Sequence, residues 1–241
     1  MKILILAAAT LTMTAGMAFA QDTIRMGTEG AYPPYNFIND AGEVDGFERE
    51  LGDALCLRAE LTCEWVTNEW DSIIPNLVSG NYDVIIAGMS ITDERDEVID
   101  FTQDYLPAAA SAFVAQSADA DIATGVVSAQ TSTIQAGYIA ESGAMLLEFA
   151  TPDETIASVS NGEAVAVFAD KDFLTPIVDA SGGTLMFVGE DVALGGGIGM
   201  GIRESDTELK AKFDAAITAM KDDGTLNTMI TKWFGDAAAA F

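Results

Sequence analysis

The chain has 241 residues, of which 38 are Asp or Glu, 11 are Lys or Arg and none is His, so its formal net charge is −27. The absence of histidine excludes a Ser-His-Asp or Cys-His nucleophile, a His general base and a His-ligated zinc site. So few Lys and Arg residues among so many acids cannot form the basic face that nucleic-acid binding requires. Because 49% of the residues are hydrophobic, the chain can form one large core or two smaller ones.

The N-terminus has the pattern of a cleaved export signal. Lys2 precedes an apolar run that ends at Ala18-Phe19-Ala20, which is the small-x-small pattern of a signal-peptidase site. We expect residues 1–20 to be removed after Ala20 and the mature protein to be exported to the periplasm. The alternative is a retained membrane anchor, for which the apolar run is short.

Strand and helix patterns alternate in the first third of the chain. Short apolar runs predict strands at 24–28, 63–66 and 83–87. Apolar residues at three- and four-residue spacing predict helices at 47–55 and 70–77. This alternation favours a parallel or mixed sheet covered by helices, which is an α/β fold.

The only two cysteines of the chain, Cys56 and Cys63, are seven positions apart. Cys56 falls late in a predicted helix and Cys63 at the start of a predicted strand, so a turn between them can bring the two side chains together. In an oxidising compartment we expect a structural disulfide. Two free thiols are the alternative.

The pattern changes after residue 107. Residues 107–133 are poor in large apolar side chains, and the alternation resumes with a strand at 165–168, a helix at 172–180 and a strand at 185–188. We therefore expect a first lobe of residues 22–112 with 197–241 and a second lobe of residues 113–196. The glycine-rich segment 195–201 predicts a crossing between the lobes. It does not match the dinucleotide motif G-x-G-x-x-G, because Met200 stands at the third glycine.

Two helices are expected at the C-terminus. Ser205 and Glu208 have the spacing of an S-x-x-E capping box, and an apolar stripe through Phe213 and Ile217 follows. A second stripe runs over residues 226–233 and stops before Gly235.

Four segments together resemble the family 3 periplasmic solute-binding proteins, the receptors of ABC importers for polar amino acids. They are GTEGAYPPYNF at 27–37, GEVDGFERELGDALC at 42–56, NEWDSIIPNLVSGNYDVIIAGMSITDERDEVIDFT at 68–102 and KDDGTLNTMITKWFG at 221–235. The motifs are most similar to those of the lysine/arginine/ornithine- and histidine-binding members, whose disulfide the two cysteines also resemble. The resemblance implies a type II periplasmic binding-protein fold of two α/β lobes joined by two hinge strands. It also implies a monomer without cofactor or metal, which binds an amino acid between the lobes and docks on an inner-membrane ABC permease.

The resemblance implies roles for residues whose chemistry suits them. A guanidinium grips a carboxylate with two parallel hydrogen bonds, so Arg95 is expected to hold the ligand carboxylate, together with Ser90, the Gly88 amide and the region of Thr133. The alternative for Arg95 is a surface salt bridge to a neighbouring acid at 93, 94 or 96. Asp170, at the carboxyl end of a predicted strand, is expected to accept the ligand ammonium; its alternative is a helix N-cap.

The side chain of the ligand is expected to lie between Tyr32 and Trp70, with Gln130 and Gln135 nearby; plain core packing is the alternative for both rings. Glu29 favours a basic amino acid, because members that select cations carry an acid at this position. The alternatives are a solvated Glu29 with a neutral polar or opine-like ligand, and a periplasmic dehydratase-like enzyme on the same fold that uses Glu29 and Asp170 as acid and base. The loop at Ser132, where the family carries glycine, departs from the usual pattern.

Overall fold

The computed structural model describes residues 23–236, 238 and 240–241. The expected export signal and its cleavage after Ala20 lie outside these residues. Within the described part of the chain, none of the helices is both long enough and apolar enough to cross a membrane.

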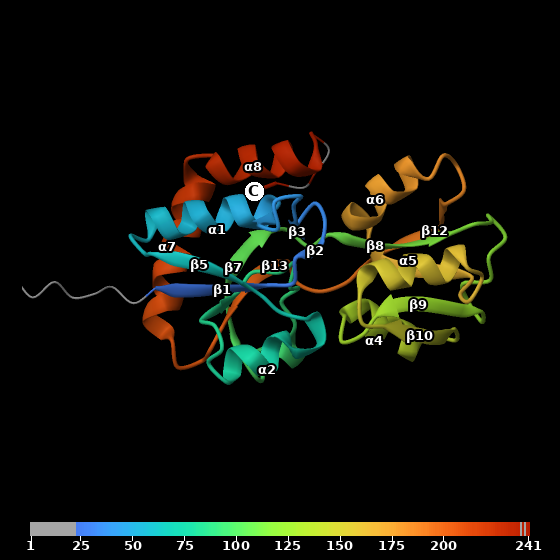
Figure 1. Cartoon of the computed structure of the whole chain (residues 1–241), viewed down its shortest axis with the longest axis horizontal. Helices are drawn as coiled ribbons and strands as arrows, with labels where there is room; N and C mark the ends of the chain where they lie inside the picture. Colours follow the sequence, from blue (N-terminus) through green and yellow to red (C-terminus); the bar gives the residue numbers. More distant parts are fainter. Residues whose placement is uncertain (1–22, 237, 239) are drawn as a thin grey trace, which may run out of the picture.

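The chain forms two α/β lobes that lie side by side (Figure 1). The first contains a five-stranded sheet in the order β5-β1-β6-β13-β7. Strands β5, β1 and β6 are parallel, whereas β13 comes from late in the chain and inserts antiparallel between β6 and β7. The bounds are β1 Ile24–Thr28, β5 Cys63–Thr67, β6 Val84–Ile85, β7 Asp100–Leu106 and β13 Ile198–Ile202.

Helices cover both faces of this sheet. Its long helices are α1 Phe47–Arg58, α7 Thr207–Asp222 and α8 Thr225–Phe234, which share one face, while the short helix α2 Ile73–Val78 covers the other. The remaining elements are the small sheet β2 Ala31–Tyr32, β3 Asn36–Ile38 and β4 Val44–Asp45, a 3₁₀ turn at Trp70–Ser72 and the one-turn helix α3 Asp93–Asp96.

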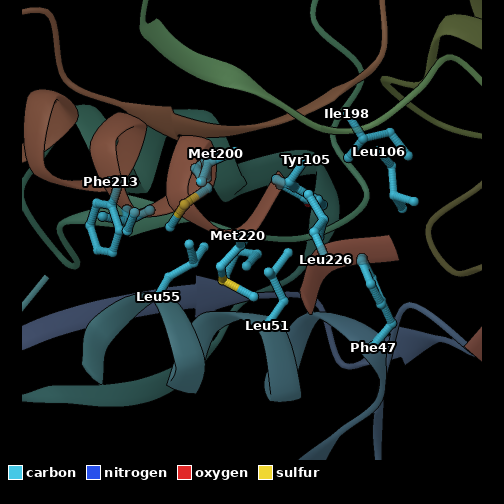
Figure 2. Close-up of a cluster of buried hydrophobic side chains, with 14 of the residues drawn as sticks. Phe47, Leu51, Leu55, Tyr105, Leu106, Ile198, Met200, Phe213, Met220 and Leu226 are labelled. Atoms are coloured by element: carbon cyan, nitrogen blue, oxygen red, sulfur yellow. The ribbon is translucent and has the colours of Figure 1, made fainter. Parts of the chain in front are cut away.

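The core of the first lobe forms where the predicted apolar stripes meet. Leu51 and Leu55 of α1 point toward Met220 of α7, and Phe213 and Met200 pack beside them (Figure 2). All five side chains are fully buried. Burial of a side chain of this size stabilises the fold by about 1.5–3 kcal/mol, so this core fixes α1 and the C-terminal helices to the sheet.

The second lobe contains a sheet in the order β10-β9-β11-β8-β12. Its strands are β8 Ala110–Ala115, β9 Val126–Gln130, β10 Met145–Phe149, β11 Ala166–Asp170 and β12 Met186–Ala193. Strands β9, β10 and β11 are parallel, and β8 is antiparallel to its neighbours β11 and β12. Helices α5 Pro152–Ser160 and α6 Lys171–Ala180 cover one face, and α4 Ile134–Glu141 covers the other.

Two chain segments pass between the lobes. Residues 107–109 connect β7 to β8, and residues 194–197 connect β12 to β13. The boundary expected between residues 112 and 113 falls inside β8, which pairs with the second sheet from Ala110 onward. The division into residues 22–112 with 197–241 and 113–196 stays a prediction.

The disulfide between Cys56 and Cys63 is confirmed, with the two Cα atoms 6.3 Å apart. Cys56 lies near the end of α1 and Cys63 begins β5, so the bond fastens this helix to the edge strand of the first sheet. The predicted alternative of two free thiols is therefore not observed.

The predicted capping box at Ser205 and Glu208 is wrong. The N-cap residue of α7 is Asp206, whose side chain makes no capping bond, and the Ser205 hydroxyl donates to the Asp206 carboxylate at 2.9 Å. A capping box does begin α5, where Thr151 and Glu154 bond to each other's backbone. The S-x-x-E spacing failed because helix α7 starts one residue later than the motif requires.

Candidate functional site

A cavity lies between the two lobes and is lined by residues of both. We call it the interlobe cavity. All of the residues predicted to bind ligand line it: Glu29, Tyr32, Trp70, Gly88, Ser90, Arg95, Gln130, Thr133, Gln135 and Asp170. The structure thus brings together side chains that are up to 141 positions apart in the sequence.

The direction of the parallel strands explains this convergence. Glu29 follows β1, Gly88 follows β6, Gln130 ends β9 and Asp170 ends β11. Parallel strands end at the same edge of their sheet, and in open α/β sheets this edge is where ligands bind. The two sheets present these edges to each other across the cavity.

Arg95 is surrounded by carbonyl groups and an aromatic ring. Its Nη1 donates to the Ser90 carbonyl at 2.8 Å, its Nη2 donates to the Ser132 carbonyl at 3.3 Å, and its Cζ lies 5.5 Å from the centre of the Trp70 ring. In the described residues no carboxylate forms an ion pair with Arg95, so the predicted alternative of a surface salt bridge is not observed. Burial lowers the pKa of Arg95 to about 10, which leaves it positively charged at neutral pH and able to hold an anion.

The amide of Gly88 is engaged by a buried carboxylate. Gly88 has a φ of 63°, in the left-handed region that glycine adopts readily, and its N–H donates to Glu48 Oε1 at 2.6 Å. This corrects the expectation that the amide is free for a ligand carboxylate, although Gly88 still lines the cavity.

Glu48 is a residue that the sequence analysis missed. Its side chain is fully buried on α1 and also accepts hydrogen bonds from Asn36 Nδ2 at 2.7 Å and from the Tyr105 hydroxyl. Burial raises the pKa of Glu48, and these donors oppose the rise. The sequence spacing could have indicated this residue. Glu48, Leu51 and Leu55 are spaced i, i+3, i+7, which places an acid on the buried face of a helix.

Asp170 points into the cavity. Its Oδ2 accepts from the Tyr32 hydroxyl at 2.9 Å, and its Oδ1 accepts from Gln135 Nε2 at 3.0 Å. Although Asp170 occupies the N-cap position of α6, its side chain makes no capping bond, so the predicted alternative role is not observed. Burial raises the pKa of Asp170 to about 6, and it is still ionised at pH 7.

Glu29 reaches across the cavity to the second lobe. Its Oε1 accepts from Gln130 Nε2 at 2.6 Å, and the same nitrogen donates to the Ala150 carbonyl at 3.0 Å. Burial raises the pKa of Glu29 to about 7, and the charge of Glu69 adds to the rise. A nearby cation would reverse this effect.

Aromatic rings form the walls of the cavity. Tyr32 stacks on Phe173 of α6, with ring centres 4.1 Å apart and planes 11° apart. Trp70 is 8% exposed, and its Nε1 donates to the Ser132 carbonyl at 3.3 Å. Both rings line the cavity, so neither is simply core packing. The sequence analysis missed most of the remaining lining because small or apolar residues there have the same pattern as core: Ala87, Ile134, Pro152, Thr155, Phe168, Ala169 and Phe173.

The loop before α4 holds its shape through its own hydrogen bonds. Thr133 is the N-cap of α4: its hydroxyl accepts from the Ala136 N–H at 3.1 Å and donates to the Gln130 carbonyl at 2.6 Å. Ser132 has a φ of 58°, a conformation that is uncommon for a residue other than glycine. Its carbonyl thereby faces Trp70 and Arg95 of the first lobe.

These features can be compared with known proteins. Residues 24–236 match the sequence model of the bacterial extracellular solute-binding proteins, family 3. The chain belongs to this family. A periplasmic His/Glu/Gln/Arg/opine family-binding protein from Silicibacter pomeroyi, crystallised in complex with lysine, is 78% identical, with a TM-score of 0.90 over 91% of this chain and 100% of that chain.

Two curated relatives align with nearly the whole of this chain. The octopine-binding periplasmic protein of Rhizobium meliloti is 32% identical over 94% of this chain and 95% of its own length. The lysine/arginine/ornithine-binding periplasmic protein of Escherichia coli K12 is 30% identical over 92% of both chains. These relatives are binding proteins of the periplasm, and the expected membership of family 3 is confirmed.

Proposed function

We propose that this family 3 protein is the periplasmic substrate-binding protein of an ABC importer and binds a basic L-amino acid in the interlobe cavity. The observation that supports this most is the arrangement of charge. Arg95 has no carboxylate partner among the described residues, Asp170 faces the same cavity from the other lobe, and Glu29 is a second acid in the same cavity.

The α-carboxylate of the ligand binds Arg95. The guanidinium presents N–H groups as a planar fork, and the Ser90 hydroxyl and the loop at Thr133 border the same part of the cavity. The ligand carboxylate replaces the Ser132 carbonyl on Nη2, because an ionised acceptor forms a stronger bond than a neutral one. The α-ammonium binds Asp170, which Tyr32 and Gln135 hold in place.

The side chain of the ligand lies between Tyr32 and Trp70, and its distal cation binds Glu29. A cation there would favour the ionised form of Glu29, whose pKa burial raises to about 7. The lysine complex of the 78% identical protein and the lysine/arginine/ornithine-binding relative support a basic ligand. The octopine-binding relative favours an opine-like ligand as a second candidate.

The protein binds and delivers its ligand without chemical change, as a monomer that docks on an inner-membrane permease after export and removal of residues 1–20. Direct contacts already join the lobes, from Glu29 to Gln130 and from Tyr32 to Asp170. Ligand therefore enters when the lobes separate, and the closed form is the one that the permease recognises.

The test is calorimetric titration of the protein, stripped of ligand, with the twenty amino acids, ornithine, citrulline and octopine. The proposal predicts that lysine, arginine or ornithine binds most tightly. If no α-amino acid binds, the proposal is wrong, and tightest binding of octopine would favour the opine candidate. NMR of the bound compound after prolonged incubation should show it unchanged, whereas turnover would indicate an enzyme that uses Glu29 and Asp170.

A further inference from the structure

A second hollow lies directly outside the interlobe cavity. This outer groove is open to solvent, and its lining includes Thr67, Asn68 and Glu69 of the first lobe and Thr151 of the second. Glu29 lines both the groove and the interlobe cavity. The two hollows are therefore neighbours, and Glu29 stands between them.

The partition between the two hollows is thin. Trp70 and Pro152 line the interlobe cavity, while the preceding residues, Glu69 and Thr151, line the outer groove. Gln130 completes the partition on the inner side, where its Nε2 bonds to Glu29 at 2.6 Å and to the Ala150 carbonyl at 3.0 Å. Glu29 and Gln130 contribute side chains, which change rotamer far more readily than backbone moves.

The charged residues that line the outer groove are three acids, Glu29, Glu43 and Glu69, and one cation, Arg49, which pairs with Asp53, so acidic charge predominates. Glu69 is exposed, and in the described part of the chain no hydrogen bond or ion pair engages its carboxylate. Its charge reaches Glu29, since it contributes to the raised pKa of that group. A positively charged nitrogen next to Glu29 thus remains favourable when the group attached to it extends into the groove.

The opposite end of the cavity is enclosed. Both carboxylate oxygens of Asp170 accept hydrogen bonds, from Tyr32 and from Gln135, and Tyr32 stacks on Phe173. A substituent on a ligand nitrogen at Asp170, such as the carboxyethyl group on the α-nitrogen of octopine, would have to displace these packed side chains, so this inference and the opine candidate exclude each other. A substituent on a nitrogen at Glu29 needs only the bond between Gln130 and Glu29 to open.

We propose that the ligand site continues past Glu29 into the outer groove, so that the protein also binds basic amino acids that carry an alkyl substituent on the distal nitrogen and keep its positive charge. N6-alkyl-lysines and Nω-alkyl-arginines are this class of ligand. The inference rests on the proposed function, because it requires the α-amino and α-carboxylate groups to lie at Asp170 and Arg95.

The test compares two isomers of one modified ligand by calorimetry on the ligand-free protein. N6-isopropyl-lysine should bind within about tenfold of lysine, whereas Nα-isopropyl-lysine should bind at least about a hundredfold more weakly, because only the second must displace packed groups. Equal losses of affinity for the two isomers would overturn the proposal.

A groove variant makes the test specific. Thr67 is exposed, lines the outer groove and does not line the interlobe cavity, so Thr67→Trp should narrow the groove alone. The ratio of the dissociation constants of N6-isopropyl-lysine and lysine should rise at least about tenfold in this variant. The ratio should stay the same in Thr62→Trp, a matched control at an exposed position outside both hollows.

An unchanged ratio in Thr67→Trp would overturn the extension of the site. If lysine binds tightly and the ratio does not respond, only this inference fails. If lysine, arginine and ornithine do not bind at all, the proposed function and the inference both fail.

Discussion

Three charged groups face the interlobe cavity, and burial moves the pKa of each of them closer to 7. The pKa of Arg95 falls to about 10, and those of Asp170 and Glu29 rise to about 6 and about 7. Each group loses hydration without forming an ion pair within the described chain, although Arg95 and Asp170 attract each other across the cavity. A zwitterionic ligand with a distal cation supplies all three missing partners, and this is why it fits the site.

Glu29 should make the recognition of a cation depend on pH. Its pKa of about 7 means that the free protein must release a proton from Glu29 to bind a cation below this pH, so affinity falls as the pH falls. Arginine should bind about tenfold more weakly at pH 6 than at pH 8, measured relative to the uncharged isostere citrulline. The comparison cancels the contribution of Asp170, which both ligands share.

The Glu29→Gln variant is the control for this prediction. Its ratio of arginine to citrulline affinity should not change between pH 6 and pH 8, because the titrating group is gone. A ratio that is independent of pH in the unaltered protein would contradict the role of Glu29.

At the scale of elements, Glu48 connects α1 to the floor of the cavity. It bonds to Asn36 of β3, to the amide of Gly88 after β6 and to Tyr105 of β7. The position of the cavity residues that follow β6 thus depends on a helix whose other buried side chains are apolar core.

Glu48→Ala should lower the free energy of unfolding by about 3–5 kcal/mol, because it leaves three donors unpaired in the interior. Urea denaturation measures this loss. Glu43→Ala, at an exposed position, should cost less than about 0.5 kcal/mol. Equal stabilities of the two variants would show that the Glu48 contacts contribute nothing.

The disulfide between α1 and β5 closes a short loop of the chain. A separation of 7 residues predicts a stabilisation of about 2 kcal/mol from restriction of the unfolded chain. The double variant Cys56→Ser with Cys63→Ser should show this loss in urea denaturation. Dithiothreitol should destabilise the unaltered protein by a similar amount and leave the double variant unaffected; a response of the double variant to the reductant would contradict this account.

The elements that the sequence predicted best are those with large side chains at regular spacing. Strand β1 has its predicted bounds, and the apolar faces of α1, α7 and α8 meet in one core. Between residues 100 and 160, strands β7 to β10 and helices α4 and α5 were not predicted. Strand β8 consists largely of Ala and Ser, whose apolar surface is too small to give a clear period, and its partners β11 and β12 are distant in sequence. Strands β7 and β10 do carry large apolar side chains, and the sequence analysis missed them.

The candidate site was predicted almost entirely through the family motifs. Spacing alone left Arg95 open between a surface ion pair and a ligand contact, and Asp170 between an N-cap and a ligand contact. The fold brings the ends of β1, β6, β9 and β11 to one cavity, and in the described residues it shows neither an ion pair at Arg95 nor a capping bond from Asp170. The ligand contacts of both residues stay a prediction. The motif around Gly88 could not predict the hydrogen-bond partner of the Gly88 amide, because that partner, Glu48, is 40 positions away in sequence.

At the scale of the whole molecule, the charge of −27 surrounds a cavity with an acid at Glu29. Such a field should speed the association of cationic ligands and should be screened by salt. The association rate constant of arginine, measured by stopped-flow fluorescence, should fall severalfold between about 10 and 300 mM NaCl. The reason is that the Debye length shortens from about 30 Å to below about 8 Å over this range. Citrulline should show little change; an equal response of both ligands would contradict electrostatic steering.

The two lobes make the cavity jointly, so neither holds a complete site. Arg95 lies on α3 and Glu29 directly follows β1, both in the first lobe, whereas Asp170 and Gln130 belong to strands of the second. Binding energy is therefore available only when the lobes are closed, which couples ligand capture to the shape of the molecule.

The most direct measurement of the central claim is the affinity of Arg95→Ala for lysine, compared by calorimetry with that of Arg58→Ala. Arg58 is an arginine of the same lobe outside the cavity, paired with Asp223 at the surface. Loss of the bidentate carboxylate contact should weaken lysine binding at least about a hundredfold in Arg95→Ala and leave Arg58→Ala unchanged. If lysine bound both variants equally tightly, the interlobe cavity would not be the amino-acid site.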